Sequence, residues 1–188
     1  VFSLYENRIM IKYTLEDAHS ATTLRFRPFL AFRSVKSLTQ ANGNVNQSYT
    51  EVPNGIKTCM YHGYPELYMQ FNKKVKFVYE PYWYNGIEYP KEQERGYPYK
   101  EDLYVPGYFE IPIKKGESII FSAGDSPVAT TRLKSLYENE VNARTPRTSF
   151  FNCLKNSAQQ FYFRPKEDDA YLLAGYPWFK VRARDLFV

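Results

Sequence analysis

The stretch at residues 174–185, Ala-Gly-Tyr-Pro-Trp-Phe-Lys-Val-Arg-Ala-Arg-Asp, holds the side chains best suited to binding chemistry. Its glycine allows a backbone conformation that a Cβ atom would forbid, and its proline keeps Tyr176 extended. The rings of Tyr176 and Trp178 stand close in sequence to the pair Arg184 and Asp185. Because sugar C–H faces lie on aromatic rings and paired polar groups bind neighbouring hydroxyls, this combination suits a polyhydroxylated ligand. The alternative is an aromatic turn with a surface ion pair.

A second constellation combines charges with a tyrosine-rich segment. Glu94 and Arg95 come first, and Glu101, Asp102 and Tyr104 follow. A charged loop of this kind could reach a substrate bound by a neighbouring domain. Alternatively, its charges form a buried network that pins the loop. Both interpretations of these five residues stay open, and all five are candidate substrate-binding residues.

Apolar and polar residues alternate over most of the first two thirds of the chain, which is typical of strands. The expected strands are 8–13, 22–33, 49–52, 56–61, 67–71, 75–84, 108–113 and 117–121, and 96–107 is expected to be a long loop. Hairpins are predicted across 53–55, 72–74 and 114–116. Along 82–84, Trp83 should face away from Tyr82 and Tyr84. These tyrosines and Trp83 are either a sugar platform or partly core.

The pattern changes after Gly124. Asp125-Ser126-Pro127 is typical of a helix start, and Thr148 or Ser149 is expected to cap a second helix. A last hairpin is expected within 161–174. Many antiparallel strands followed by two helices predict a mainly β fold, an antiparallel β-sandwich with linker helices behind it.

Four stretches of the chain together resemble one known family, in the family's order. They are Leu24-Arg25-Phe26-Arg27-Pro28 with Arg33, Glu94-Arg95-Gly96 followed by Glu101-Asp102-Leu103-Tyr104-Val105-Pro106-Gly107, Ala158-Gln159-Gln160-Phe161, and Ala174-Gly175-Tyr176-Pro177-Trp178-Phe179 with Arg184-Asp185. In these stretches the chain resembles glycogen debranching enzymes of the bacterial and archaeal amylo-α-1,6-glucosidase type.

The resemblance implies a domain order. The family's N-terminal domain is similar to a galactose-mutarotase-like supersandwich, and linker helices and an (α/α)6 catalytic barrel follow it. We therefore expect a β-sandwich over 1–124 with its front part missing, a helical linker over 125–163, and a truncated start of the barrel over 164–188. On this interpretation the chain is an excised fragment of a glycoside hydrolase that acts on α-glucans in glycogen catabolism.

Glycosidic hydrolysis needs two carboxyl groups flanking the bond. The resemblance implies that both lie in the barrel beyond Val188, so no catalytic residue is expected here and the fragment should be inactive. It also implies that Arg184 and Asp185 hold hydroxyls of the terminal sugar, beside Trp178 and Tyr176. The family usually has Trp-Gly before that Arg-Asp pair, whereas this chain has Arg182-Ala183. The change removes a stacking ring and puts the parent's α-1,6 specificity in question.

The leading interpretation is a non-catalytic N-terminal domain whose partners are an α-glucan and its own C-terminal barrel. The first alternative is an independent carbohydrate-binding β-sandwich, which aromatic residues clustered on one exposed face would favour. The second is an oligomerisation or scaffold module, which an exposed apolar patch would favour. The sequence does not decide among the three.

Composition argues against several other classes. The chain has 188 residues and a net charge of +5, but its basic residues are dispersed among acidic ones, which disfavours nucleic-acid binding. Cys59 and Cys153 are far apart and His19 and His62 are single, so no metal or cofactor is expected. No apolar run approaches the ~18 residues of a membrane span. We expect no membrane partner and a cytoplasmic location.

Overall fold

The computed structural model describes residues 1–3, 6–34, 37–166 and 169–173. The chain divides into two compact units, Val1–Tyr137 and Glu138–Val188, and each is described by itself. The substrate-binding candidates at 174–188 lie outside the described residues.

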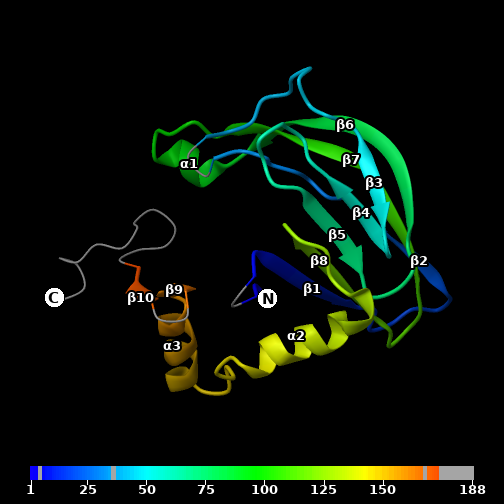
Figure 1. The fold of residues 1–188 in the computed structure, drawn as a ribbon. Helices are drawn as coiled ribbons and strands as arrows, with labels where there is room; N and C mark the ends of the chain where they lie inside the picture. Colours follow the sequence, from blue (N-terminus) through cyan, green and yellow to red (C-terminus); the bar gives the residue numbers. More distant parts are fainter. Residues whose placement is uncertain (4–5, 35–36, 167–168, 174–188) are drawn as a thin grey trace. The chain divides into compact units, whose positions relative to one another are not determined.

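The first unit contains two antiparallel sheets (Figure 1). The five-stranded sheet has the order β1-β8-β5-β4-β3, formed by Arg8–Thr14 (β1), Ser118–Gly124 (β8), Leu67–Phe71 (β5), Gly55–Thr58 (β4) and Tyr49–Val52 (β3). The three-stranded sheet has the order β2-β7-β6, formed by Thr22–Phe26 (β2), Lys100–Ile113 (β7) and Lys76–Glu88 (β6). A short helix α1, Pro90–Glu94, connects β6 to β7.

Aromatic side chains fill the space between the two sheets. Phe71 and Phe121 of the five-stranded sheet lie 5.1 Å apart between ring centroids, and Phe71 lies 5.0 Å from Phe109 of β7. Phe26 of β2 packs on all three rings. Burial of large aromatic surface is the main stabilising term in such a core. The predicted antiparallel β-sandwich is therefore confirmed.

The other face of the five-stranded sheet is covered by the start of a helix. A 3-10 turn at Thr130–Arg132 leads into α2, Leu133–Asn142. Leu133 is fully buried against Met10 of β1 and Ile120 of β8. Met10 and Ile120 point to this side because neighbouring residues in a strand face opposite ways.

The second unit contains α3, Phe150–Gln159, and a hairpin of β9, Tyr162–Lys166, with β10, Asp169–Leu172. The hydroxyl of Ser149 accepts a hydrogen bond from the backbone N–H of Asn152, so Ser149 caps α3 as predicted. The expected final hairpin is also confirmed. The domain boundaries predicted at 124 and 163 stay predictions.

Five local predictions are wrong. The turns at 72–74 and 114–116 do not join paired strands, because β5 and β8 belong to one sheet and β6 and β7 to the other. Most of the expected loop at 96–107 belongs to a strand, because β7 begins at Lys100. Strand 22–33 ends at Phe26, shortly before Pro28. The helix expected at Asp125 begins only with the turn at Thr130.

Candidate functional site

The outer face of the three-stranded sheet carries a row of rings and guanidinium groups. We call it the outer strip, formed by Arg25, Arg27, Phe29, Tyr82, Tyr84 and Tyr108. Phe26 and Phe109, their neighbours in β2 and β7, face the core. Alternation along the strands therefore sends Arg25 and Tyr108 to the outside, and Arg27, directly after β2, lies on the same side over the ring of Tyr108.

Glu110 lies at one end of the outer strip. The β2–β7–β6 register places Arg25 and Lys76 on either side of it. Arg25 Nη2 donates to Glu110 at 2.9 Å, and Lys76 Nζ lies 3.7 Å from its other oxygen. The hydrogen bond from Arg25 lowers the pKa of Glu110 below its ordinary value. Glu110 is thus an ionised partner of two cations.

Arg27 connects the middle of the outer strip. Its Nη1 donates to the hydroxyl of Tyr82 at 2.7 Å, and its Nη2 lies 3.4 Å from a carboxylate oxygen of Glu80. The guanidinium carbons of Arg25 and Arg27 lie 4.3 and 5.0 Å from the ring centroid of Tyr108. Cation–π contacts of this length hold both guanidinium groups in place.

The other end of the outer strip is an exposed aromatic pair. Phe29 and Tyr84 meet edge to face at 5.0 Å, and their exposed fractions are 44% and 50%. Between Tyr82 and Tyr84, Trp83 turns inward and meets the buried ring of Tyr104 at 5.5 Å. The predicted alternation at 82–84 is confirmed, and the sheet divides these three rings between surface and core.

Glu101 forms a buried network. Its carboxylate is 1% exposed and accepts hydrogen bonds from Arg33 Nε and Nη2, the Tyr89 hydroxyl at 2.6 Å and the Thr39 N–H at 3.0 Å. Burial opposes ionisation, but the bonds from Arg33 and Tyr89 outweigh it and lower the pKa of Glu101. The network holds the chain around Arg33 and Thr39 against β7.

The other candidates of this segment are divided among separate environments. Asp102 accepts the backbone N–H groups of Ala41 at 2.9 Å and Gly86 at 2.8 Å. Tyr104 is 1% exposed, so its ring packs in the core. Glu94 and Arg95 are exposed at α1 and pair with Lys91 at 2.9 Å and Glu92 at 3.1 Å. The five candidate residues do not converge on one open cleft.

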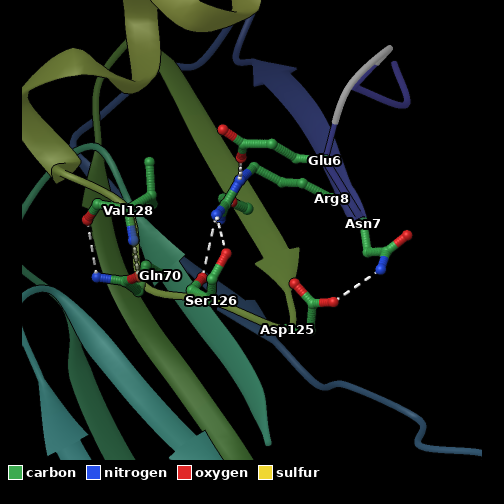
Figure 2. Close-up of polar contacts among 8 residues, drawn as sticks. Glu6, Asn7, Arg8, Gln70, Asp125, Ser126 and Val128 are labelled. Carbon is green, nitrogen blue, oxygen red and sulfur yellow. Dashed lines mark hydrogen bonds and ion pairs between the residues drawn. The ribbon is translucent and has the colours of Figure 1, made fainter. Parts of the chain in front are cut away.

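A polar cluster holds the segment through which the chain leaves the sandwich (Figure 2). Arg8 of β1 is 5% exposed and donates to Ser122 Oγ, Ser126 Oγ and the Ser126 carbonyl, each at 3.1 Å. Glu6 accepts from Arg8 Nε at 2.8 Å, and Asn7 donates to Asp125 at 2.8 Å. Sequence reasoning treated Asp125 and Ser126 as a helix start because their partners, Asn7 and Arg8, are more than 100 residues away.

The described residues of the second unit expose large apolar side chains. On α3, Phe150 is 80% exposed, Phe151 72% and Leu154 53%. Among the described residues, no group of three or more His, Cys, Asp or Glu could hold a metal ion. No helix in the described part of the chain is long and apolar enough to span a membrane.

Comparison with known families bears directly on this fold. The model of a family described as "Glycogen debranching enzyme N terminal" matches residues 1–120. The chain belongs to this family. No curated protein and no solved structure gives a significant match to it.

The match to the family covers the whole two-sheet core except the last residues of β8. It confirms the resemblance drawn from the stretches around Arg25 and Glu101. The outer strip and the Glu101 network both lie within the matched residues. Sequence reasoning identified Arg25 and Arg27 only as carriers of the resemblance, because strand pairing alone brings them to Tyr82 and Tyr108.

Proposed function

We propose that this chain is a non-catalytic N-terminal domain of an α-1,6-glucosidase that debranches glycogen-like α-glucans. The observation that carries the proposal is the match of the debranching-enzyme N-terminal family to residues 1–120, which span nearly all of the two-sheet core. The carboxylate pKa values agree with a non-catalytic role. Among the described residues, each carboxylate with a shifted pKa is shifted down, namely Glu66, Glu101, Glu110 and Glu117. A glycosidase needs one carboxylic acid with a raised pKa beside a second carboxylate.

An open depression at one end of the sandwich supports the same proposal. It has a volume of about 570 Å³ and is lined by residues that include Lys73, Lys114 and Glu117. Its carboxylate Glu117 already accepts a hydrogen bond from Lys73 Nζ at 2.5 Å. A single paired carboxylate fits neither the retaining nor the inverting arrangement.

The test is hydrolysis by the purified chain. Glycogen, its limit dextrin and an isomaltose-type substrate are each incubated with the chain, and glucose is measured against a buffer blank. We expect no release. Glucose release that survives purification and disappears in Glu110→Gln or Glu117→Gln would overturn the proposal, because a contaminant would not respond to these changes.

In the parent enzyme, we propose that Arg184 and Asp185 bind hydroxyls of the terminal sugar beside Trp178 and Tyr176. Losing one charge-assisted hydrogen bond costs about 1.5–3 kcal/mol. Asp185→Asn in the full-length parent should therefore lower kcat/KM roughly ten- to hundredfold, at ~1.4 kcal/mol per decade. A structural ion pair would instead lower the melting temperature and leave activity per folded molecule intact.

The exposed side chains of α3 support the C-terminal barrel as a partner in the parent. Phe150 and Phe151 are adjacent and are the two most exposed large apolar side chains among the described residues, and exposed apolar patches mark interaction sites. Burying them should stabilise the parent, so Phe150→Ser with Phe151→Ser should lower its melting temperature. Self-association of this chain through the same residues, seen by light scattering and lost in the double variant, would favour the oligomerisation alternative instead.

A further inference from the structure

We propose that the outer strip binds a neutral α-glucan chain, with Phe29 and Tyr84 as its stacking platform and Arg25 and Arg27 as its hydrogen-bond donors. The inference rests on the proposed function for its ligand class. It goes beyond that function because it assigns a binding surface to residues of the sandwich itself and not to the candidate residues after Leu173.

The stacking surface is the Phe29–Tyr84 pair. The ring of Tyr108 is covered by the guanidinium groups of Arg25 and Arg27, at 4.3 and 5.0 Å, so it offers little free surface. Phe29 and Tyr84 touch edge to face and are both about half exposed. Two fixed rings at a right angle present one face and one edge to a ligand, which suits the C–H side of a pyranose.

The hydrogen-bonding surface lies beside the rings. A guanidinium group carries five N–H donors. Arg25 uses Nη2 for Glu110, and Arg27 uses Nη1 for Tyr82 and Nη2 for Glu80. Their side chains are 54% and 36% exposed, and their other N–H groups have no hydrogen-bond partner among the described residues. These donors, with the oxygens of Glu80 as acceptors, match the mixed demands of sugar hydroxyls.

The charge balance favours a neutral ligand over an anion. Each guanidinium group of the outer strip lies within 3.4 Å of a carboxylate oxygen, from Glu110 or Glu80. Lys76 shares Glu110 with Arg25, so the three cations and two carboxylates leave a net charge of only +1. An anionic ligand that approached Arg25 or Arg27 would meet that carboxylate as well, and like charges repel. A polyhydroxylated chain has no such conflict. The ion pairs thus orient the donors without creating an anion site.

The outer strip is also ordered before any ligand arrives. Arg25 projects from a paired strand, Arg27 follows the end of that strand directly, and cation–π contacts fix both side chains over Tyr108. Long flexible side chains normally lose conformational entropy when a ligand immobilises them, which weakens binding. Side chains that are already fixed avoid most of this cost, so a shallow surface can still bind.

The experiment measures retention of the whole 188-residue chain in native gels that contain glycogen, and titration with maltoheptaose. Tyr84→Ala removes half of the stacking surface, and Arg27→Ala removes one of the two hydrogen-bond donors. Tyr64→Ala is the matched control, because Tyr64 is 45% exposed but belongs to the segment between β4 and β5. We expect the wild type and the control to be retarded equally, and each strip variant to bind maltoheptaose about three- to tenfold more weakly.

Equal binding by the wild type and both strip variants, or no binding by the wild type, would overturn the inference. Retention that high salt abolishes and that an anionic polymer competes away would also overturn it, because the outer strip would then act as a charged surface. Melting temperatures show that the variants fold, and Phe29→Ala replaces any variant that does not. None of these outcomes touches the proposed lack of catalysis, which the glucose-release assay tests separately.

Discussion

The side-chain amide of Gln70 pairs with both backbone groups of Val128, accepting from the N–H at 2.8 Å and donating to the carbonyl at 3.2 Å (Figure 2). Its amide nitrogen also donates to the carbonyl of Pro53 at 3.0 Å. Gln70 is 1% exposed, so these contacts replace water completely. The amide of Gln70 therefore satisfies both backbone groups of Val128, as a paired strand would, and fixes the segment that follows β8.

Gln70→Glu should destabilise the sandwich. Glutamate keeps the size of the side chain but loses both amide donors, which leaves the carbonyls of Pro53 and Val128 without their partner. A buried group left unsatisfied costs about 1–3 kcal/mol. The midpoint of urea unfolding should fall accordingly. Gln93→Glu is the control, because Gln93 is exposed on α1, and an equal loss in both variants would contradict the role of Gln70.

Glu101 should make the fold sensitive to acid. Its folded-state pKa is lowered from 4.5, so its contribution to stability is complete above that value and is lost as the pH falls through the lowered pKa. Glu101→Gln should cost about 1.5–3 kcal/mol at neutral pH, because Arg33 and Tyr89 lose a charged acceptor. The difference between wild type and variant should shrink as the pH falls below 4.5.

Unfolding by urea at several pH values measures that difference. Glu66, Glu110 and Glu117 also have lowered pKa values and will steepen the acid dependence of both proteins equally. Subtracting the two curves therefore isolates Glu101. A difference that stays constant from neutral pH to below 4.5 would show that the carboxylate charge contributes nothing.

Tyr104 carries a buried hydroxyl with no hydrogen-bond partner among the described residues. Burial, together with the nearby Tyr79, raises the pKa of Tyr104 to about 12. Because an unpaired buried hydroxyl is unfavourable, Tyr104→Phe should leave stability unchanged or raise it by about 1 kcal/mol. Tyr89→Phe is the contrasting variant and should destabilise, since the Tyr89 hydroxyl donates to Glu101. Calorimetry compares the melting temperatures of both variants with that of the wild type, and a lower melting temperature for Tyr104→Phe would contradict the prediction.

Local signals predicted the parts of the fold that depend on neighbours in sequence. The β3–β4 hairpin follows from Pro53-Asn54-Gly55, and Asn54 has the positive φ of 55° that such a turn requires. The cap of α3 at Ser149 was predicted for the same reason. Alternation also predicted the strand at 8–13, where Ile11 and Tyr13 pack against the core.

Contacts between distant residues explain the failures. Asn72 is a residue type typical of hairpin turns. Its side chain instead accepts a hydrogen bond from the N–H of Ile120 at 2.9 Å, and the chain then continues into the other sheet. Ser126 has the side chain of a helix cap, but its hydroxyl accepts a hydrogen bond from Arg8 instead. The outer strip was missed for the same reason, because Arg27 and Tyr82 meet only through β7.

Gly107 should be the least replaceable glycine of the three-stranded sheet. Its φ is +145°, and a Cβ atom there would lie 2.1 Å from the carbonyl oxygen of Val78 and 2.9 Å from the backbone nitrogen of Glu80. The register of β6 against β7 shifts directly after this point, so the close approach belongs to a β-bulge.

Because the clash is with backbone atoms, no side-chain rotation relieves it, and Gly107→Ala should cost about 3 kcal/mol or more. The bulge precedes Tyr82 and Tyr84, so the variant should also disturb the aromatic half of the outer strip. Gly43→Ala is the matched control, since nothing lies within 4 Å of the added Cβ atom. Soluble yield and melting temperature are compared for the two variants. Equal melting temperatures for Gly107→Ala and Gly43→Ala would contradict this prediction. They would show that the backbone of β6 moves to make room for the added Cβ atom.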